Sequence, residues 1–140
     1  MNLEVLKAQL VRHEGLRLKP YQDSVGKLTI GVGRNLDDVG ITDAEAMTLL
    51  ENDITGLMVD LDRELTWWRN MSETRQLVLA DLAFNLGLPR LKGFRNALQA
   101  MQEARWDDAS REMLGSTWAR QVGPRALRLA KMMKEDKEAA

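Results

Sequence analysis

The chain has 140 residues, of which 44% are hydrophobic and 29% are charged, and its formal net charge is -1. This composition is ordinary for a globular protein, and we expect a single domain over residues 1–140. The absence of cysteine excludes disulfides and a thiolate zinc site, and a single histidine, His13, argues against a histidine-ligated metal or a serine triad. No apolar run approaches the roughly 18 residues of a membrane span, so we expect no stable membrane insertion.

The first predicted element is an amphipathic helix over residues 2–13, with Asn2 as its N-cap and Gly15 ending it. Glu14 continues an apolar stripe at helical spacing that begins with three leucines, Leu3, Leu6 and Leu10. The edge of an apolar surface and the helix C-terminus both disfavour a charged carboxylate, which suits a general acid. The alternative is a boundary side chain whose stem only covers apolar surface.

A β-hairpin is predicted next, with strands at residues 17–21 and 27–31 and a turn at residues 23–26. Alternation along the second strand places Thr29 on the opposite face from its two apolar neighbours. We therefore expect Thr29 to point away from the apolar side of the hairpin.

Glu14, Asp23 and Thr29 form the candidate catalytic group of the chain. Singly, Asp23 is also a common turn residue and Thr29 a common strand residue. Together, two carboxylates in different environments and a hydroxyl that can hold a water molecule match the needs of an inverting glycosidase.

The remainder of the chain is predicted to be helical. Thr42 and Glu45 form a capping box that opens a long helix to about residue 65, and Ser72 caps a helix that ends at Gly87. Residues 88–93 are predicted to be a turn-rich connection. Further helices are expected at residues 94–105, 107–114 and, opened by Pro124, 124–136.

These elements predict an α+β fold that is mainly α. A small N-terminal β-hairpin lobe is expected at about residues 15–41, and a helical lobe from residues 1–14 and 42–136. The long helix joins the hairpin lobe to a C-terminal helical bundle.

The segment from His13 to Leu36 resembles the active-site signature of a known family. The spacing Glu14-x8-Asp23-x5-Thr29 lies within HEGLRLKPYQDSVGKLTIGVGRNL, where EGLRLKPY, TIG and the G-x-G also match. Further along, LADLAFNLG, GFRNAL, RWDDA and residues 118–125 resemble family landmarks. The chain is thus similar to the phage-type lysozymes, or endolysins, of glycoside hydrolase family 24, which are muramidases of the T-even phage lysozyme kind.

This resemblance implies a lysozyme-like fold and hydrolysis of the β-1,4 bond between N-acetylmuramic acid and N-acetylglucosamine. It implies that Glu14 protonates the leaving oxygen, while Asp23 and Thr29 act on the opposite side of the sugar. Asp23 would stabilise positive charge or orient the attacking water, and Thr29 would hold that water. No metal and no organic cofactor are expected.

Two further residues receive a role only through the resemblance. Phe84 is expected to contact the glycan, although without the family it would be interpreted as an ordinary core side chain. Arg125 matches the arginine that pairs with the catalytic glutamate, here Glu14. The chain departs from the best-known members at Arg34, which stands where they carry histidine, and at Asn85, a shorter amide than is usual there.

Charge is unevenly distributed and bears on the expected partner. Residues 1–34 carry six Lys and Arg against three Asp and Glu, and residues 88–134 carry ten against four. Residues 35–87 are acidic, with three basic side chains against eleven acidic ones. Basic surfaces flanking a cleft would attract an anionic polymer such as bacterial peptidoglycan.

The resemblance also sets expectations for the place of action. We expect synthesis in a bacterial host cytoplasm without a signal peptide, because no basic-then-apolar leader pattern is present at the N-terminus. The protein would act as a monomer on glycan strands in the periplasm or cell wall, after holin-type release or from a virion.

The sequence leaves three alternatives open. A lytic transglycosylase would cut the same bond without water. A non-catalytic cell-wall-binding or virion component would keep the fold without the reaction. A nucleic-acid-binding module would explain the basic segment at residues 88–134, but the acidic middle of the chain argues against it.

Overall fold

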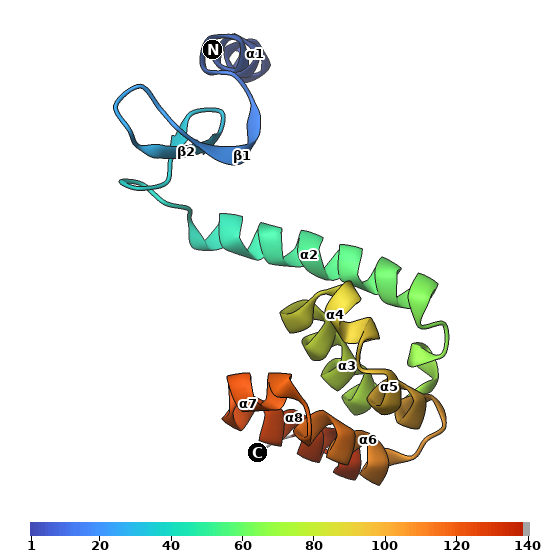
Figure 1. Cartoon of the computed structure of the whole chain (residues 1–140). Helices are drawn as coiled ribbons and strands as arrows, with labels where there is room; N and C mark the ends of the chain where they lie inside the picture. Colours follow the sequence, from blue (N-terminus) through green and yellow to red (C-terminus); the bar gives the residue numbers. More distant parts are fainter. Residues whose placement is uncertain (139–140) are drawn as a thin grey trace. The chain divides into compact units, whose positions relative to one another are not determined.

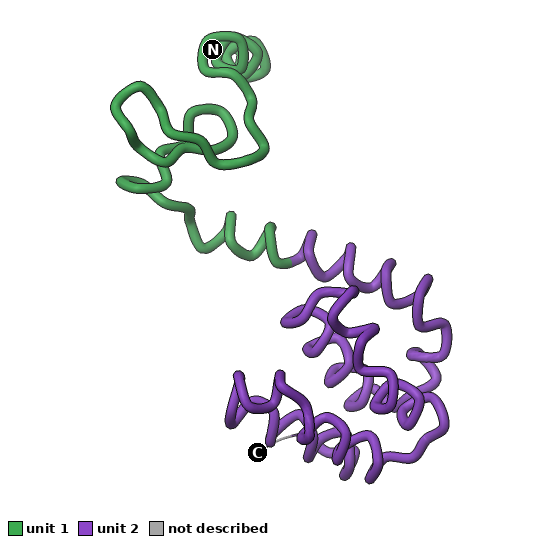
Figure 2. The backbone as a smooth tube through the Cα atoms, in the orientation of Figure 1, with its two compact units in different colours: residues 1–50 green, residues 51–140 purple. Residues whose placement is uncertain are grey.

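The computed structural model describes residues 1–138, and the chain divides into two compact units, Met1–Leu50 and Glu51–Ala140 (Figure 2). Helices dominate, accompanied by a small antiparallel sheet near the N-terminus (Figure 1). The predicted class, α+β and mainly α, is confirmed. The expectation of a single domain, with residues 1–14 in the helical lobe, stays a prediction.

The first helix, α1 (Leu3–Glu14), ends where the sequence predicted. The Asn2 side chain accepts a hydrogen bond from the Val5 N–H at 3.1 Å, which satisfies one of the free donors of the first turn. Gly15 follows with a φ of +82°, a conformation that glycine adopts without strain, and its N–H donates to the Val11 carbonyl. The direction of the chain therefore changes directly after Glu14.

The hairpin is formed by β1 (Arg17–Gln22) and β2 (Leu28–Gly31), joined by the predicted turn. A third strand, β3 (Arg34–Asn35), pairs with β2 to give the order β1-β2-β3. The sequence did not predict β3, because two residues are too few for an alternating pattern. The presence of β3 makes β2 the central strand.

Thr29 is the buried residue of the hairpin. Its side chain is 3% exposed, whereas the neighbouring Leu28 is 39% exposed. Thr29 lies on the central strand between Tyr21 of β1 and Asn35 of β3, so it has neighbours on both sides. The opposite exposures of Leu28 and Thr29 agree with the predicted alternation, and the buried face of β2 is the one that carries Thr29.

The long helix, α2 (Asp43–Glu64), begins with the predicted capping box. The Glu45 N–H donates to Thr42 Oγ1 at 3.1 Å, and the Thr42 N–H donates to Glu45 Oε1 at 2.9 Å. The first turns of α2 belong to the first unit and its remainder to the second (Figure 2).

The second unit is helical, with α6 packed against α5 and α8, and α3 packed against α4 and α8. The predicted connection at residues 88–93 is instead a short helix, because proline suits a first helical turn as well as a loop. No helix within residues 1–138 is long and apolar enough to cross a bilayer. The elements after α2 are η1 (Trp68–Asn70), α3 (Glu73–Leu86), α4 (Leu88–Lys92), α5 (Arg95–Gln102), α6 (Trp106–Leu114), α7 (Thr117–Val122) and α8 (Pro124–Glu135).

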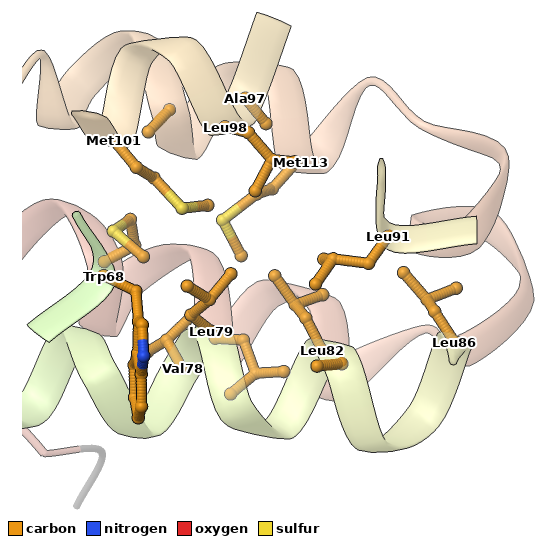
Figure 3. Close-up of a cluster of buried hydrophobic side chains, with 14 of the residues drawn as sticks. Trp68, Val78, Leu79, Leu82, Leu86, Leu91, Ala97, Leu98, Met101 and Met113 are labelled. Atoms are coloured by element: carbon orange, nitrogen blue, oxygen red, sulfur yellow. The ribbon is translucent and has the colours of Figure 1, made fainter. Parts of the chain in front are cut away.

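The hydrophobic core lies in this second unit (Figure 3). Helix α3 contributes Val78, Leu79 and Leu82, each of which is completely buried. Leu91 of α4 and Met113 of α6 are likewise buried. Burying one side chain of this size stabilises a fold by about 1.5–3 kcal/mol. The core therefore gives the C-terminal helices a fixed arrangement.

Candidate active site

Glu14 is the last residue of α1 and its carboxylate lies against the turn between β2 and β3. The side chain is exposed. A Cβ built on Gly33 would lie 2.9 Å from Glu14 Oε2, so the carboxyl group approaches the backbone of this turn closely. Glu14 thus contacts the β2–β3 turn at Gly33, a residue without a side chain.

Asp23 begins the turn of the hairpin and is held by the backbone that follows it. Its Oδ1 accepts hydrogen bonds from the N–H groups of Val25 and Lys27, both at 2.9 Å. These two bonds orient the carboxylate and occupy Oδ1, so Oδ2 is the oxygen that can face a substrate or a water molecule.

Thr29 is tied to the same peptide as Asp23. Its hydroxyl donates to the carbonyl of Lys27 at 2.9 Å, and that carbonyl also accepts the Asp23 N–H at 2.9 Å. The Lys27 N–H in turn donates to Asp23 Oδ1. The structure therefore brings Asp23 and Thr29 together through the backbone of Lys27, a residue that the sequence did not single out.

Arg34 forms an ion pair within the first unit. Its Nη1 donates to Glu45 Oε1 at 2.7 Å and to the Gly40 carbonyl at 3.2 Å. The hydrogen bond from Arg34, followed by those from Thr42, lowers the pKa of Glu45 to about 2. This contact links β3 to the first turn of α2.

Phe84 and Arg125 lie in the second unit. Phe84 is 48% exposed on α3, so the alternative of a plain core side chain is wrong. Arg125 of α8 donates through Nε to Asp81 Oδ1 at 3.0 Å, a partner that the sequence did not indicate. Asp81 and Phe84 are three residues apart and share a face of α3. The pairing of Arg125 with Glu14 stays a prediction.

Asn85 fixes the neighbouring aromatic side chain. Its Oδ1 accepts a hydrogen bond from Trp118 Nε1 at 2.7 Å, and Trp118 is 2% exposed. The shorter amide therefore still reaches the indole. This bond satisfies a buried donor and ties α7 to the end of α3 beside Phe84.

The first unit thus combines one carboxyl group at a helix end with an oriented carboxylate and an oriented hydroxyl on the hairpin. These groups can transfer a proton and hold a water molecule, which are the two tasks of acid–base hydrolysis. Among residues 1–138, no group of three or more His, Cys, Asp or Glu side chains is arranged to hold a metal ion.

Comparison with known proteins agrees with this chemistry. The profile of the family described as phage lysozyme matches residues 11–135. The chain is 26% identical to "Probable T4-type lysozyme 2" of Dictyostelium discoideum over 89% of this chain and 90% of that protein. It is 30% identical to the pre-baseplate central spike protein Gp5 of Enterobacteria phage T4, over 86% of this chain and 26% of that protein. An endolysin of Acyrthosiphon pisum secondary endosymbiont phage 1 is 33% identical over 55% of this chain and 53% of its own length.

The match over most of the chain defines the class of protein: a glycoside hydrolase of the lysozyme kind, which degrades peptidoglycan. The chain belongs to the phage lysozyme family.

Proposed function

We propose that the protein is a muramidase that hydrolyses the β-1,4 bond between N-acetylmuramic acid and N-acetylglucosamine with inversion at the anomeric carbon. Glu14 protonates the leaving oxygen. Asp23 and Thr29 serve the opposite side of the sugar, where the water attacks. In the cell this reaction would lyse a bacterial host for a phage or prophage.

The attachment of Asp23 and Thr29 to the same Lys27 peptide is the observation that carries this proposal. Because a carbonyl only accepts hydrogen bonds, the Thr29 hydroxyl must donate its hydrogen to Lys27. Its oxygen is then left as an acceptor for a hydrogen of the attacking water. This arrangement directs a lone pair of the water towards the sugar.

The carboxylate of Asp23 is also oriented by hydrogen bonds to the backbone. Two backbone N–H groups hold Oδ1, and Oδ2 is available to orient the water or to stabilise positive charge on the sugar ring. Inverting enzymes keep their two carboxyl groups about 6.5–9.5 Å apart, which leaves room for this water, whereas retaining enzymes keep them about 5–5.5 Å apart. A role for Thr29 in holding water favours the inverting arrangement.

The second unit would supply glycan contacts. Phe84 presents an exposed aromatic ring that can pack against a sugar, and Asp81 holds the Arg125 guanidinium near the same face of α3. We propose Phe84 and Arg125 as substrate-binding residues, with Arg125 also pairing with Glu14.

The direct test is the Glu14→Gln variant in a turbidity assay on outer-membrane-permeabilised bacteria. The amide keeps the size of the side chain but removes the transferable proton, so the lysis rate should fall at least ~10²-fold. Glu4→Gln, at an exposed carboxylate of the same helix, is the matched control and should lyse at the wild-type rate. A Glu14→Gln protein that clears cells at the wild-type rate would show that Glu14 is not the general acid.

Product analysis tests the remaining steps. NMR of the first-formed product should show the α-anomer from the β-linked substrate. A β-anomer, or a covalent glycosyl adduct on Asp23, would make Asp23 a nucleophile and the enzyme retaining. An anhydro-sugar end would identify a lytic transglycosylase instead of a hydrolase.

A further inference from the structure

Gly33 lies in the turn between β2 and β3, where the Glu14 carboxyl group approaches the backbone. We propose that Gly33 is a positioning residue for Glu14, because only a residue without a side chain leaves room for this carboxyl group. The catalytic consequence rests on the proposed role of Glu14 as the general acid. The contact itself does not depend on that role.

The contact involves the whole end of the Glu14 side chain. A Cβ on Gly33 would lie 2.9 Å from Oε2, 3.3 Å from Cδ and 3.4 Å from Cγ. A carbon atom cannot approach an oxygen at 2.9 Å without a shift, and rotation of the carboxylate alone leaves the two carbon contacts close. Any L side chain at this position must therefore move the Glu14 side chain or the turn.

Backbone conformation alone does not explain this glycine. Gly33 has a φ of +71°, but Gly31 has a φ of +70°, and a Cβ built on Gly31 meets no atom within 4 Å. The same open space surrounds Gly26 on the hairpin turn. Positive φ is thus common to all three glycines, whereas a close approach to the carboxyl group is specific to Gly33 among them.

The turn is held on its far side, so Glu14 is the partner that must give way. Arg34 pairs with Ile30 across β2 and β3, and its guanidinium bonds to the Gly40 carbonyl and to Glu45. Glu14, in contrast, is an exposed side chain at the end of its helix. An added methyl group at Gly33 would therefore displace the carboxyl group, and a displacement of about 1 Å can lower a catalytic rate ~10²-fold.

The experiment compares Gly33→Ala with Gly31→Ala, which has the same positive φ but no close neighbour. Initial rates are measured against the concentration of soluble peptidoglycan glycan strands, and stability is measured by thermal unfolding. Gly33→Ala should lower kcat by about 10- to 100-fold with KM within about twofold, whereas Gly31→Ala should keep the wild-type kcat. Equal kcat values for the two variants would overturn the proposal.

A stability cycle tests the contact independently of catalysis. Gly33→Ala should lower Tm more than Gly31→Ala does, since it adds a steric contact to the strain of positive φ. In a Glu14→Ala background the three close atoms are gone, so the two alanine variants should lower Tm equally. If the extra loss from Gly33→Ala persists without the Glu14 side chain, the proposed contact is wrong.

The two arms separate this inference from the proposed function. If Glu14→Gln kept full activity while the stability cycle behaved as expected, the catalytic role of Glu14 would be wrong. Gly33→Ala would then have no expected effect on kcat, but the contact between Gly33 and Glu14 would stand. If Glu14→Gln were inactive while Gly33→Ala kept the wild-type kcat, the positioning role alone would be overturned.

Discussion

Residues 1–50 and residues 51–138 are stabilised by different interactions. Within residues 1–50, all of which the structure describes, Thr29 is the only buried side chain, and α1 has none. The buried hydrophobic side chains among residues 1–138 all lie between Leu61 and Met133. The first unit relies instead on caps, turns and polar contacts, including the Arg34–Glu45 pair.

The residues proposed for catalysis and the residues that form the hydrophobic core therefore lie in different units. The proposed acid and water-holding groups lie in the unit with little apolar burial, where the orientation of Asp23 and Thr29 comes from hydrogen bonds to the backbone. Substitutions there should change the reaction more than the free energy of unfolding. Substitutions in the core of the second unit should do the reverse.

The largest expected change in stability comes from the core of α3. Leu79→Ala removes a completely buried side chain and leaves a cavity, so the free energy of unfolding should fall by about 2–5 kcal/mol. Leu77→Ala on the same helix is the matched control, because Leu77 is 50% exposed. Urea denaturation measures the free energy of unfolding of both variants. Equal losses in the two variants would contradict the placement of the core.

A smaller effect, on activity instead of stability, is expected at Thr29. Thr29→Val keeps the branched shape but removes the oxygen that would accept a hydrogen of the water. The lysis rate should fall about tenfold or more, which is the scale of one lost hydrogen bond in a reaction. Thr48→Val removes a comparable hydroxyl-to-carbonyl bond from α2 and should leave lysis unchanged. Wild-type lysis by Thr29→Val would remove Thr29 from the mechanism.

The smallest effect concerns the ion pair between β3 and α2. The pKa of Glu45 is lowered from 4.5 to about 2, so its ionised form stabilises the folded state above pH 4.5 and this stabilisation is lost as the pH falls through about 2. Glu45→Gln can still cap the helix but cannot form the ion pair. Its Tm should lie slightly below that of the wild type at neutral pH, and the two should converge between about pH 4.5 and pH 2.

The control for this prediction is the same substitution in an Arg34→Gln background. Without the guanidinium, the Tm difference caused by Glu45→Gln should shrink at neutral pH, since Arg34 is the largest cause of the pKa shift. A Tm difference that is independent of both pH and Arg34 would mean that the ion pair does not stabilise the first unit.

Several features of the fold were predictable because they depend on neighbouring residues. The caps at Asn2 and Ser72 and the capping box at Thr42 and Glu45 all form as predicted. The turn at Asp23 likewise closes through bonds to residues two and four positions away. Such contacts are encoded within a few residues, and side-chain chemistry at a known spacing is enough to predict them.

Features that depend on distant residues were not predictable. Strand β3 exists because it pairs with β2, and that pairing makes β2 central and buries Thr29. Arg125 takes Asp81 as a partner 44 positions away, and no local pattern indicates this choice. An exposed Phe84 on a helix rich in core residues likewise follows from which face of α3 the other helices cover.

The amino-acid sequence alone contains the spacing of Glu14, Asp23 and Thr29, and it predicts the helix caps and the hairpin turn because hydrogen bonds between neighbouring residues determine them. The surroundings of Thr29 and Glu14 arise only after folding. Thr29 is buried because β2 pairs with both β1 and β3, and Glu14 meets Gly33 because the β2–β3 turn passes the end of α1. Contacts of this kind join segments that are separate in the chain, so their geometry is a property of the tertiary structure.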